Sequence, residues 1–205
     1  CHHIIPAISV RNCQRIAIRN LSIDWDFQLA SAGIVEVQPD GRTAIRVPEE
    51  YPVDENTSVR AVSEYDIRNY RWIMNGQELY YPKDVRLIGP QLLYSPSFEE
   101  DRKPPHGSGK LRSGTQLVVR HYVYEANAID MNHPENADIS LAYITIYQAP
   151  GHAFAAYACR RGFRLSRNRI MRRPGTTNLT SVTADGSHFA ATEGDIIIED
   201  CDFSH

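Results

Sequence analysis

Four segments of the chain share one apolar pattern and align without gaps, as expected of a fold built from stacked repeats. They span residues 16–23, 139–146, 163–170 and 196–203, and in each of them apolar residues occupy the first, third and last places. The sixth place holds residues that can stack inward: Leu21, Ile144, Asn168 and Cys201. The alternation predicts a strand, and the shift before the sixth place predicts a bend between one strand and the next.

The spacing of the segments predicts the architecture. From 139 to 163 is 24 residues and from 163 to 196 is 33, which fits one β-helix coil and one coil with a lengthened loop. A single coil cannot bury its inner face, whereas stacked coils pair their backbones and align like side chains. From 16 to 139 is 123, so removing one 24-residue coil leaves roughly a hundred inserted residues. We therefore expect an all-β fold.

The expected fold is a right-handed parallel β-helix of the pectate-lyase type, interrupted by a second domain. Residues 1–26 form the first coil, 27–124 the inserted domain and 125–205 the further coils. Short β-rich runs separated by turn signals predict that the insertion is an antiparallel β-barrel or sandwich. Asn75-Gly76 predicts a hairpin between 72–73 and 79–80, and a helix is expected only around 63–71.

Composition excludes several classes of function. The net charge of −3 does not favour nucleic acid, and no apolar run approaches the ~18 residues of a membrane span. The four cysteines lack a CxxC pair, so they predict buried free thiols rather than a disulfide framework or a zinc site. GxSxG, P-loop and HExxH motifs are also missing from the sequence. We expect no metal and no cofactor.

The turns that follow the four repeats should form one edge of the stack. They carry Asp24-Trp25-Asp26, Tyr147-Gln148, Met171-Arg172-Arg173 and Ser204-His205. Aromatic faces pack against sugar rings, while carboxylates and guanidinium groups bind hydroxyls in pairs, so this edge suits a carbohydrate. A solvated edge of ordinary turn residues is the alternative, and it fits the arginines better than the acidic turn at 24–26.

A second group of polar residues spans 183–189, in the lengthened loop of the last coil. An Asp followed by Gly, Ser and His can be an Asx-type turn and nothing more. In the functional interpretation, Asp185 is a general acid or base and His188 is its binding or charge-tuning neighbour.

Three stretches together resemble a known family. They are 12–26, Ala149-Pro150-Gly151 and 183–189, and they resemble the exo-acting α-1,3-galactosidases of glycoside hydrolase family 110. The resemblance covers both ends of the chain and the interruption. It implies a parallel β-helix with a β-barrel insertion and an inverting hydrolase that acts on terminal α-1,3-linked galactose with two carboxyl groups.

The resemblance implies a catalytic role for Asp185. The family's adjacent acidic pair would fall a few residues beyond His205, so we expect the catalytic set of this chain to be incomplete. The partner is a galactose-containing glycan, and the expected binding residues are Asp24, Trp25, Asp26, Tyr147, Arg172 and His188.

Other functions fit the same residues. A polysaccharide lyase or a sulfated-glycan hydrolase would use Arg172 and Arg173 to hold uronate or sulfate, and a glycan-binding or adhesive segment would bind sugar without turnover. No polar capping helix is evident at either end, so we expect further coils downstream and an apolar end capable of self-association. A secreted or periplasmic location in a bacterium is expected.

Overall fold

A computed structural model describes residues 3–101, 103 and 107–204. The chain divides into two compact units. Unit 1 comprises Cys1–Phe27 and Tyr124–His205, and unit 2 comprises Gln28–Val123. The boundaries of unit 2 lie one residue inside the predicted 27–124.

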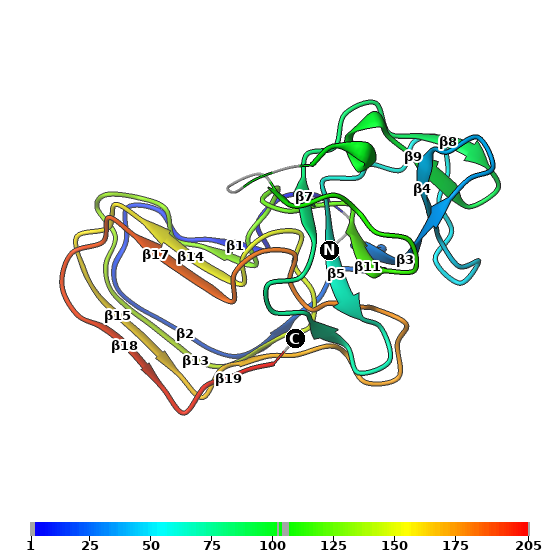
Figure 1. The fold of residues 1–205 in the computed structure, drawn as a ribbon. Helices are drawn as coiled ribbons and strands as arrows, with labels where there is room; N and C mark the ends of the chain where they lie inside the picture. Colours follow the sequence, from blue (N-terminus) through cyan, green and yellow to red (C-terminus); the bar gives the residue numbers. More distant parts are fainter. Residues whose placement is uncertain (1–2, 102, 104–106, 205) are drawn as a thin grey trace. The chain divides into compact units, whose positions relative to one another are not determined.

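The larger sheet of unit 1 is entirely parallel and is built from the four repeats (Figure 1). Its strands are β2 (Gln14–Ile23), β13 (Ala137–Ile146), β15 (Arg161–Ser166), β16 (Arg169–Ile170), β18 (Ile196–Glu199) and β19 (Asp202–Phe203). Ile139 pairs with Ile16 on one side and Phe163 on the other, and Phe163 pairs with Ile196. These pairings confirm the predicted alignment of the repeats.

A residue with left-handed backbone recurs at the predicted bend of every repeat. It is Asn20, Tyr143, Arg167 and Asp200, with φ of 58°, 56°, 54° and 51°. Non-glycine residues adopt this region rarely, so its recurrence at one place shows that the bend is a property of the repeat. Asn168 follows the bend and is fully buried. Its side chain accepts from the Ile144 N–H and donates to the Leu141 carbonyl, both at 3.0 Å.

The second sheet of unit 1 is also parallel. Its strands are β1 (Ile8–Ser9), β12 (Ile129–Asp130), β14 (Phe154–Tyr157) and β17 (Ser187–Ala190), in that order. Side chains from both sheets meet in one apolar core that includes Ile129, Ile139, Phe154, Phe163 and Ile170. Burial of each such side chain contributes about 1.5–3 kcal/mol.

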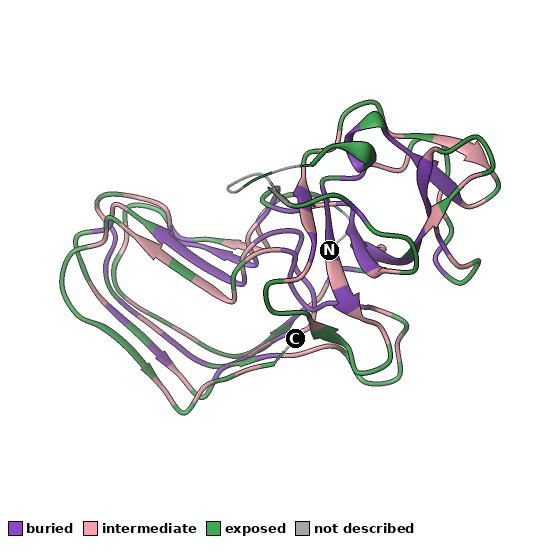
Figure 2. Ribbon diagram, viewed as in Figure 1, coloured by how far each residue is buried: buried purple, intermediate pink, exposed green. Residues whose placement is uncertain are grey.

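The strand at one edge of the larger sheet is exposed (Figure 2). Ile196, Ile197 and Ile198 of β18 all have large exposed fractions, although the first and third continue the inward-facing ladder of Phe163 and Leu165. Further coils or self-association at this edge stay predictions.

Unit 2 contains an antiparallel sheet. Its strands are β3 (Ala30–Val37), β4 (Thr43–Arg46), β5 (Ala61–Asp66), β6 (Arg71–Trp72), β7 (Glu78–Tyr80), β8 (Arg86–Gly89), β9 (Leu92–Tyr94), β10 (Gly107–Ser108) and β11 (Gln116–Arg120), with a 3-10 helix at Pro96–Glu99. The antiparallel pairing agrees with the predicted insertion, while its closure into a barrel or sandwich stays a prediction.

Two local predictions for unit 2 are wrong. The helix expected around 63–71 is replaced by β5, because β5 pairs with β11 on one side and with β7 on the other. A turn does form at Asn75-Gly76, where the Gly76 N–H donates to the Ile73 carbonyl at 3.0 Å. The strands that flank this turn, β6 and β7, each pair with β5 rather than with each other, so the predicted hairpin between them does not form.

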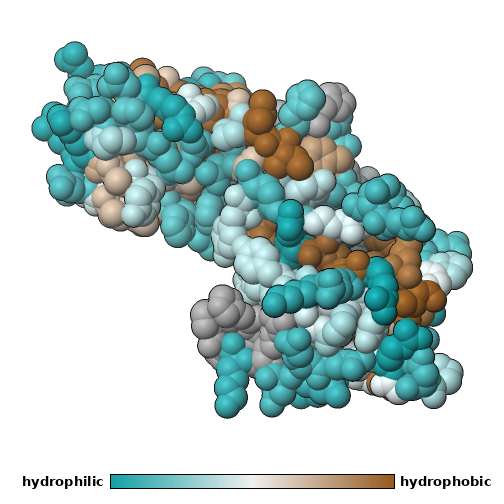
Figure 3. Space-filling model, turned by 90° about the horizontal axis from the view of Figure 1, so that it is seen from above, coloured by the Kyte–Doolittle hydropathy of each residue, from teal (hydrophilic) through white to brown (hydrophobic). Residues whose placement is uncertain are grey.

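Within the described part of the chain, no helix is both long and apolar enough to cross a membrane. Figure 3 shows one face as mainly hydrophilic with separate apolar patches. Cys13, Cys159 and Cys201 are free thiols, and Cys159 is buried, whereas Cys1 lies outside the described residues.

Candidate functional site

Asp185 lies in the turn that leads into β17. Its backbone is fixed to the preceding repeat, because its N–H donates to Nδ1 of His152 at 3.0 Å and its carbonyl accepts from the Ala153 N–H at 3.1 Å. The carboxylate itself is 59% exposed. A rigid backbone therefore presents an accessible carboxyl group.

His152 lies next to Asp185 in the turn that leads into β14, which begins at Phe154. The backbone N–H of His152 donates to Oδ1 of Asn127 at 3.2 Å. The His152 ring packs against the Tyr124 ring with 5.4 Å between the centroids. Burial lowers the pKa of His152, and the nearby charge of Asp185 opposes this effect only in part. The neutral imidazole fits the hydrogen bonds, because Nδ1 must be unprotonated to accept the Asp185 N–H.

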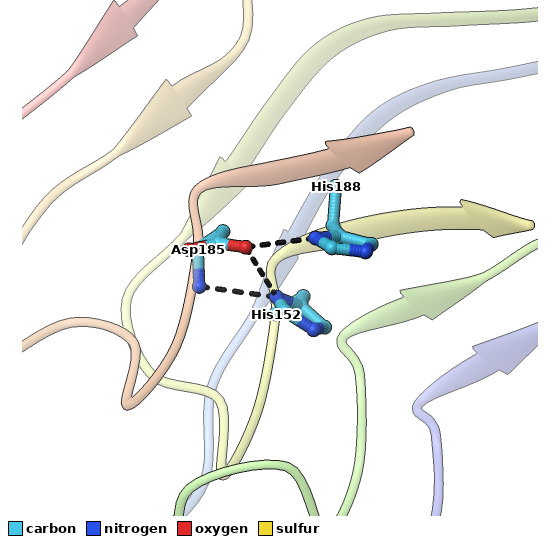
Figure 4. A group of neighbouring side chains, drawn as sticks. All are labelled: His152, Asp185 and His188. Carbon is cyan, nitrogen blue, oxygen red and sulfur yellow. Dashed lines mark hydrogen bonds and ion pairs between the residues drawn. The ribbon is translucent and has the colours of Figure 1, made fainter. Parts of the chain in front are cut away.

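His188 lies on β17, and its Nδ1 donates to Oδ2 of Asp185 at 2.8 Å. The rings of His152 and His188 stack with their centroids 4.6 Å apart and their planes at 24° (Figure 4). Nδ1 of His152 also lies 3.5 Å from Oδ2 of Asp185. Since that nitrogen carries no proton in this tautomer, its approach to Oδ2 is neither an ion pair nor a hydrogen bond.

Two imidazoles and one carboxylate therefore converge at the N-terminal ends of β14 and β17. Each residue offers a possible metal-ligating atom, and these three atoms lie within 4.8 Å of one another. The same groups are suited to acid–base chemistry and to hydrogen bonding with sugar hydroxyls.

A second cluster joins three of the turns that follow the repeats. Nη2 of Arg173 lies 2.6 Å from Oδ2 of Asp24, and its guanidinium stacks on the Tyr147 ring at 5.0 Å. Burial raises the pKa of Asp24, while the charge of Arg173 acts in the opposite direction. The expected meeting of these turns is thus present for Asp24 and Tyr147.

The remaining predicted binding residues occupy different environments. Trp25 is only 1% exposed and donates from Nε1 to the His3 carbonyl, so its expected role as a sugar platform is corrected to a core role. The side chain of Arg172 holds its own loop through the Asn178 and Thr176 carbonyls. Asp26 is exposed, and His205 lies outside the described residues.

The candidate sites also contain two residues that were not predicted to bind substrate, namely His152 and Tyr124, whereas Arg173 was expected to do so only in the lyase or sulfated-glycan alternative. A signal for His152 was present in the sequence, because Asp185 follows it by 33 residues, the offset that separates Phe163 from Ile196. Since Ala155 pairs with His188 at the same offset, that spacing predicts the contact.

Comparison with known proteins gives a distant relationship. The chain is 24% identical over 222 aligned residues to "Alpha-1,3-galactosidase B" of Bacteroides thetaiotaomicron. The alignment covers 99% of this chain and 34% of that protein, so the chain spans about a third of the relative's length. A search against protein-family models found no match. These findings suggest, at most, a relationship to glycoside hydrolases.

Proposed function

We propose that this chain belongs to an inverting exo-glycoside hydrolase that removes terminal α-1,3-linked galactose, with Asp185 as the general acid. The observation that carries this proposal is the exposed Asp185 carboxyl, whose backbone and Oδ2 are both fixed by histidines. The similarity to a protein named as an α-1,3-galactosidase, over almost the whole chain, supplies the substrate class.

The fold that we propose for unit 1 is a right-handed parallel β-helix interrupted by unit 2. Its support is the shared register of the four repeats and the left-handed residue at each bend. Successive coils then bring residues at one offset to one place, as seen for His152 and Asp185.

In the proposed reaction, Asp185 acts in its carboxylic acid form. Oδ2 faces the two imidazoles, so the proton lies on Oδ1 and passes to the glycosidic oxygen as its bond to the galactose C1 breaks. A water attacks C1 from the opposite face and gives its proton to a second carboxylate. Of the two carboxyl groups, we assign a residue to the acid only.

Substrate binding is assigned to the polar groups around Asp185. His188 and the edge of His152 offer ring nitrogens to sugar hydroxyls, and Tyr124 offers an aromatic face. Asp24, with Arg173 and Tyr147, forms a second group that suits hydroxyl pairs. The predicted bacterial secreted or periplasmic location stays a prediction.

The test is release of galactose from an α-1,3-linked galactoside by the protein that carries this chain. Asp185→Asn should lower the rate by about 10²–10⁴-fold, and NMR of the wild-type reaction should show β-galactose as the first product. Asp195→Asn, at an exposed aspartate of the same unit, is the matched control. Full activity of Asp185→Asn, or α-galactose as the first product, would contradict the proposal.

A second candidate is a glycan-binding protein without turnover. The neighbouring rings of Tyr124, His152 and His188 favour it, because a row of aromatic rings binds sugar without needing an acid pair. Calorimetric binding of an α-galactoside, with no galactose released by wild-type protein, would select this function over the hydrolase.

A further inference from the structure

Two atoms that could bind a cation, one from His152 and one from Asp185, lie close together. Nδ1 of His152 accepts the Asp185 N–H, yet it also lies 3.5 Å from the carboxylate Oδ2 of the same residue. The single lone pair of this nitrogen accepts the N–H, so a cation that binds Nδ1 takes the place of that hydrogen bond. His188 approaches the same Oδ2 from a third direction with Nδ1 at 2.8 Å.

The separations fit the ligand spacing of a small transition-metal ion. Zinc bonds of about 2.0–2.2 Å in a tetrahedral arrangement place neighbouring ligand atoms about 3.4 Å apart. The two distances to Oδ2, 2.8 and 3.5 Å, lie on either side of that value. All three ligand atoms lie within 4.8 Å of one another, so no separation exceeds the tetrahedral value by more than about 1.4 Å.

The three side chains also differ in how exposed they are and in how firmly their neighbours hold them. His152 has only 12% of its side chain exposed and is held by Asn127 and Tyr124, whereas His188 and Asp185 are 45% and 59% exposed. One ligand is therefore fixed, while the two others can turn about their side-chain bonds. Strands β14 and β17 hold the backbones of the two histidines in register.

We propose that His152, Asp185 and His188 form a binding site for a first-row transition dication such as Zn²⁺. Two imidazoles and a carboxylate are the donors that such ions prefer, and three protein ligands leave a coordination position for water. Binding displaces the proton from Nδ1 of His188, which then coordinates the ion. The ion occupies the position of the proposed general acid, so metal and galactoside compete. Only this competition rests on the proposed function.

Titration calorimetry with ZnCl₂ on the metal-free protein tests the site. We expect one ion to bind with a dependence on all three residues: His188→Ala, His152→Ala and Asp185→Asn should each weaken binding at least tenfold. His133→Ala, at another histidine of unit 1, should leave it unchanged. A His2→Ala/His3→Ala variant should also keep it, which excludes capture by the histidine pair near the chain start.

Absorption of the Co²⁺-loaded protein supplies a second measurement that is independent of activity. Intense visible bands should appear with wild type and with His133→Ala, and should be lost with His188→Ala, a substitution of a half-exposed side chain that the fold tolerates. Binding that survives in all three ligand variants, or that disappears with His2→Ala/His3→Ala, overturns the proposal. Galactoside hydrolysis that is lost on metal removal and restored by Zn²⁺ would contradict the competition and leave the metal site standing. Absence of hydrolysis in both the metal-free and the Zn²⁺-loaded protein would refute the hydrolase alone.

Discussion

Asn136 connects the first repeat of unit 1 to the second. The side chain is fully buried, donates from Nδ2 to the Val10 and Met131 carbonyls at 2.7 and 2.8 Å, and accepts from the Cys13 N–H at 3.0 Å. We predict that Asn136→Asp, which keeps the shape but removes both donors, destabilises unit 1 strongly at neutral pH.

The magnitude follows from the groups left without partners. Each buried carbonyl that loses its hydrogen bond costs about 1–3 kcal/mol, and the introduced carboxylate faces both of them, so the total is about 4 kcal/mol. With a urea m-value of about 2 kcal/mol/M, the midpoint should fall by about 2 M. Burial raises the pKa of the introduced carboxyl, so the loss is largest above that pKa and shrinks as the pH falls through it.

Tryptophan fluorescence can follow each unit separately. The chain has two tryptophans, with Trp25 in unit 1 and Trp72 in unit 2, so a Trp72→Phe background reports unit 1 alone. Asn20→Asp is the control, because Asn20 is exposed and its left-handed backbone suits Asp. The control should change stability by less than about 0.5 kcal/mol. A midpoint for Asn136→Asp within 0.5 M of its parent, roughly 1 kcal/mol, would refute the reasoning.

Three further predictions concern pH, packing and charge. Burial lowers the pKa of His121, so the unfolded state takes up more protons than the folded state as the pH falls. Unit 2 should therefore lose stability below about pH 6.5, and the loss should be smaller in His121→Asn. Equal losses in the two proteins would contradict this reasoning. Gly151→Ala places a Cβ 2.6 Å from the Ala126 carbonyl oxygen, and calorimetric melting should show a loss of more than about 2 kcal/mol. Arg173→Met should raise the pKa of Asp24 further, as measured by carboxyl NMR; an unchanged pKa would mean that the ion pair does not form in solution.

The repeat register was predictable because apolar side chains at fixed places must face one core. Ile16, Ile139, Phe163 and Ile196 align in the structure as they do in the sequence. The environment of an individual residue was harder to predict. Trp25 follows a strand and has acidic neighbours, yet its large apolar ring turns inward and fills the core.

Contacts with other parts of the chain determine the features that the local sequence pattern did not predict. Residues 61–66 form a strand because neighbours on both sides supply hydrogen bonds, which a local helical preference cannot offset. The meeting of His152 with Asp185 depends on a 33-residue offset, and no local motif marks it. Arg173 rather than Arg172 pairs with Asp24, a choice between adjacent residues that depends on the course of the loop.

The role of Asp185 as the proposed general acid is tested most directly by changing the leaving group. An aryl α-galactoside with an acidic phenol departs without protonation, whereas the sugar leaving group of an α-1,3-linked disaccharide needs the acid. For Asp185→Asn, kcat/KM should fall by about 10³-fold on the disaccharide and by less than about tenfold on the aryl galactoside. An equal fall on both substrates would contradict the assignment of Asp185 as the acid.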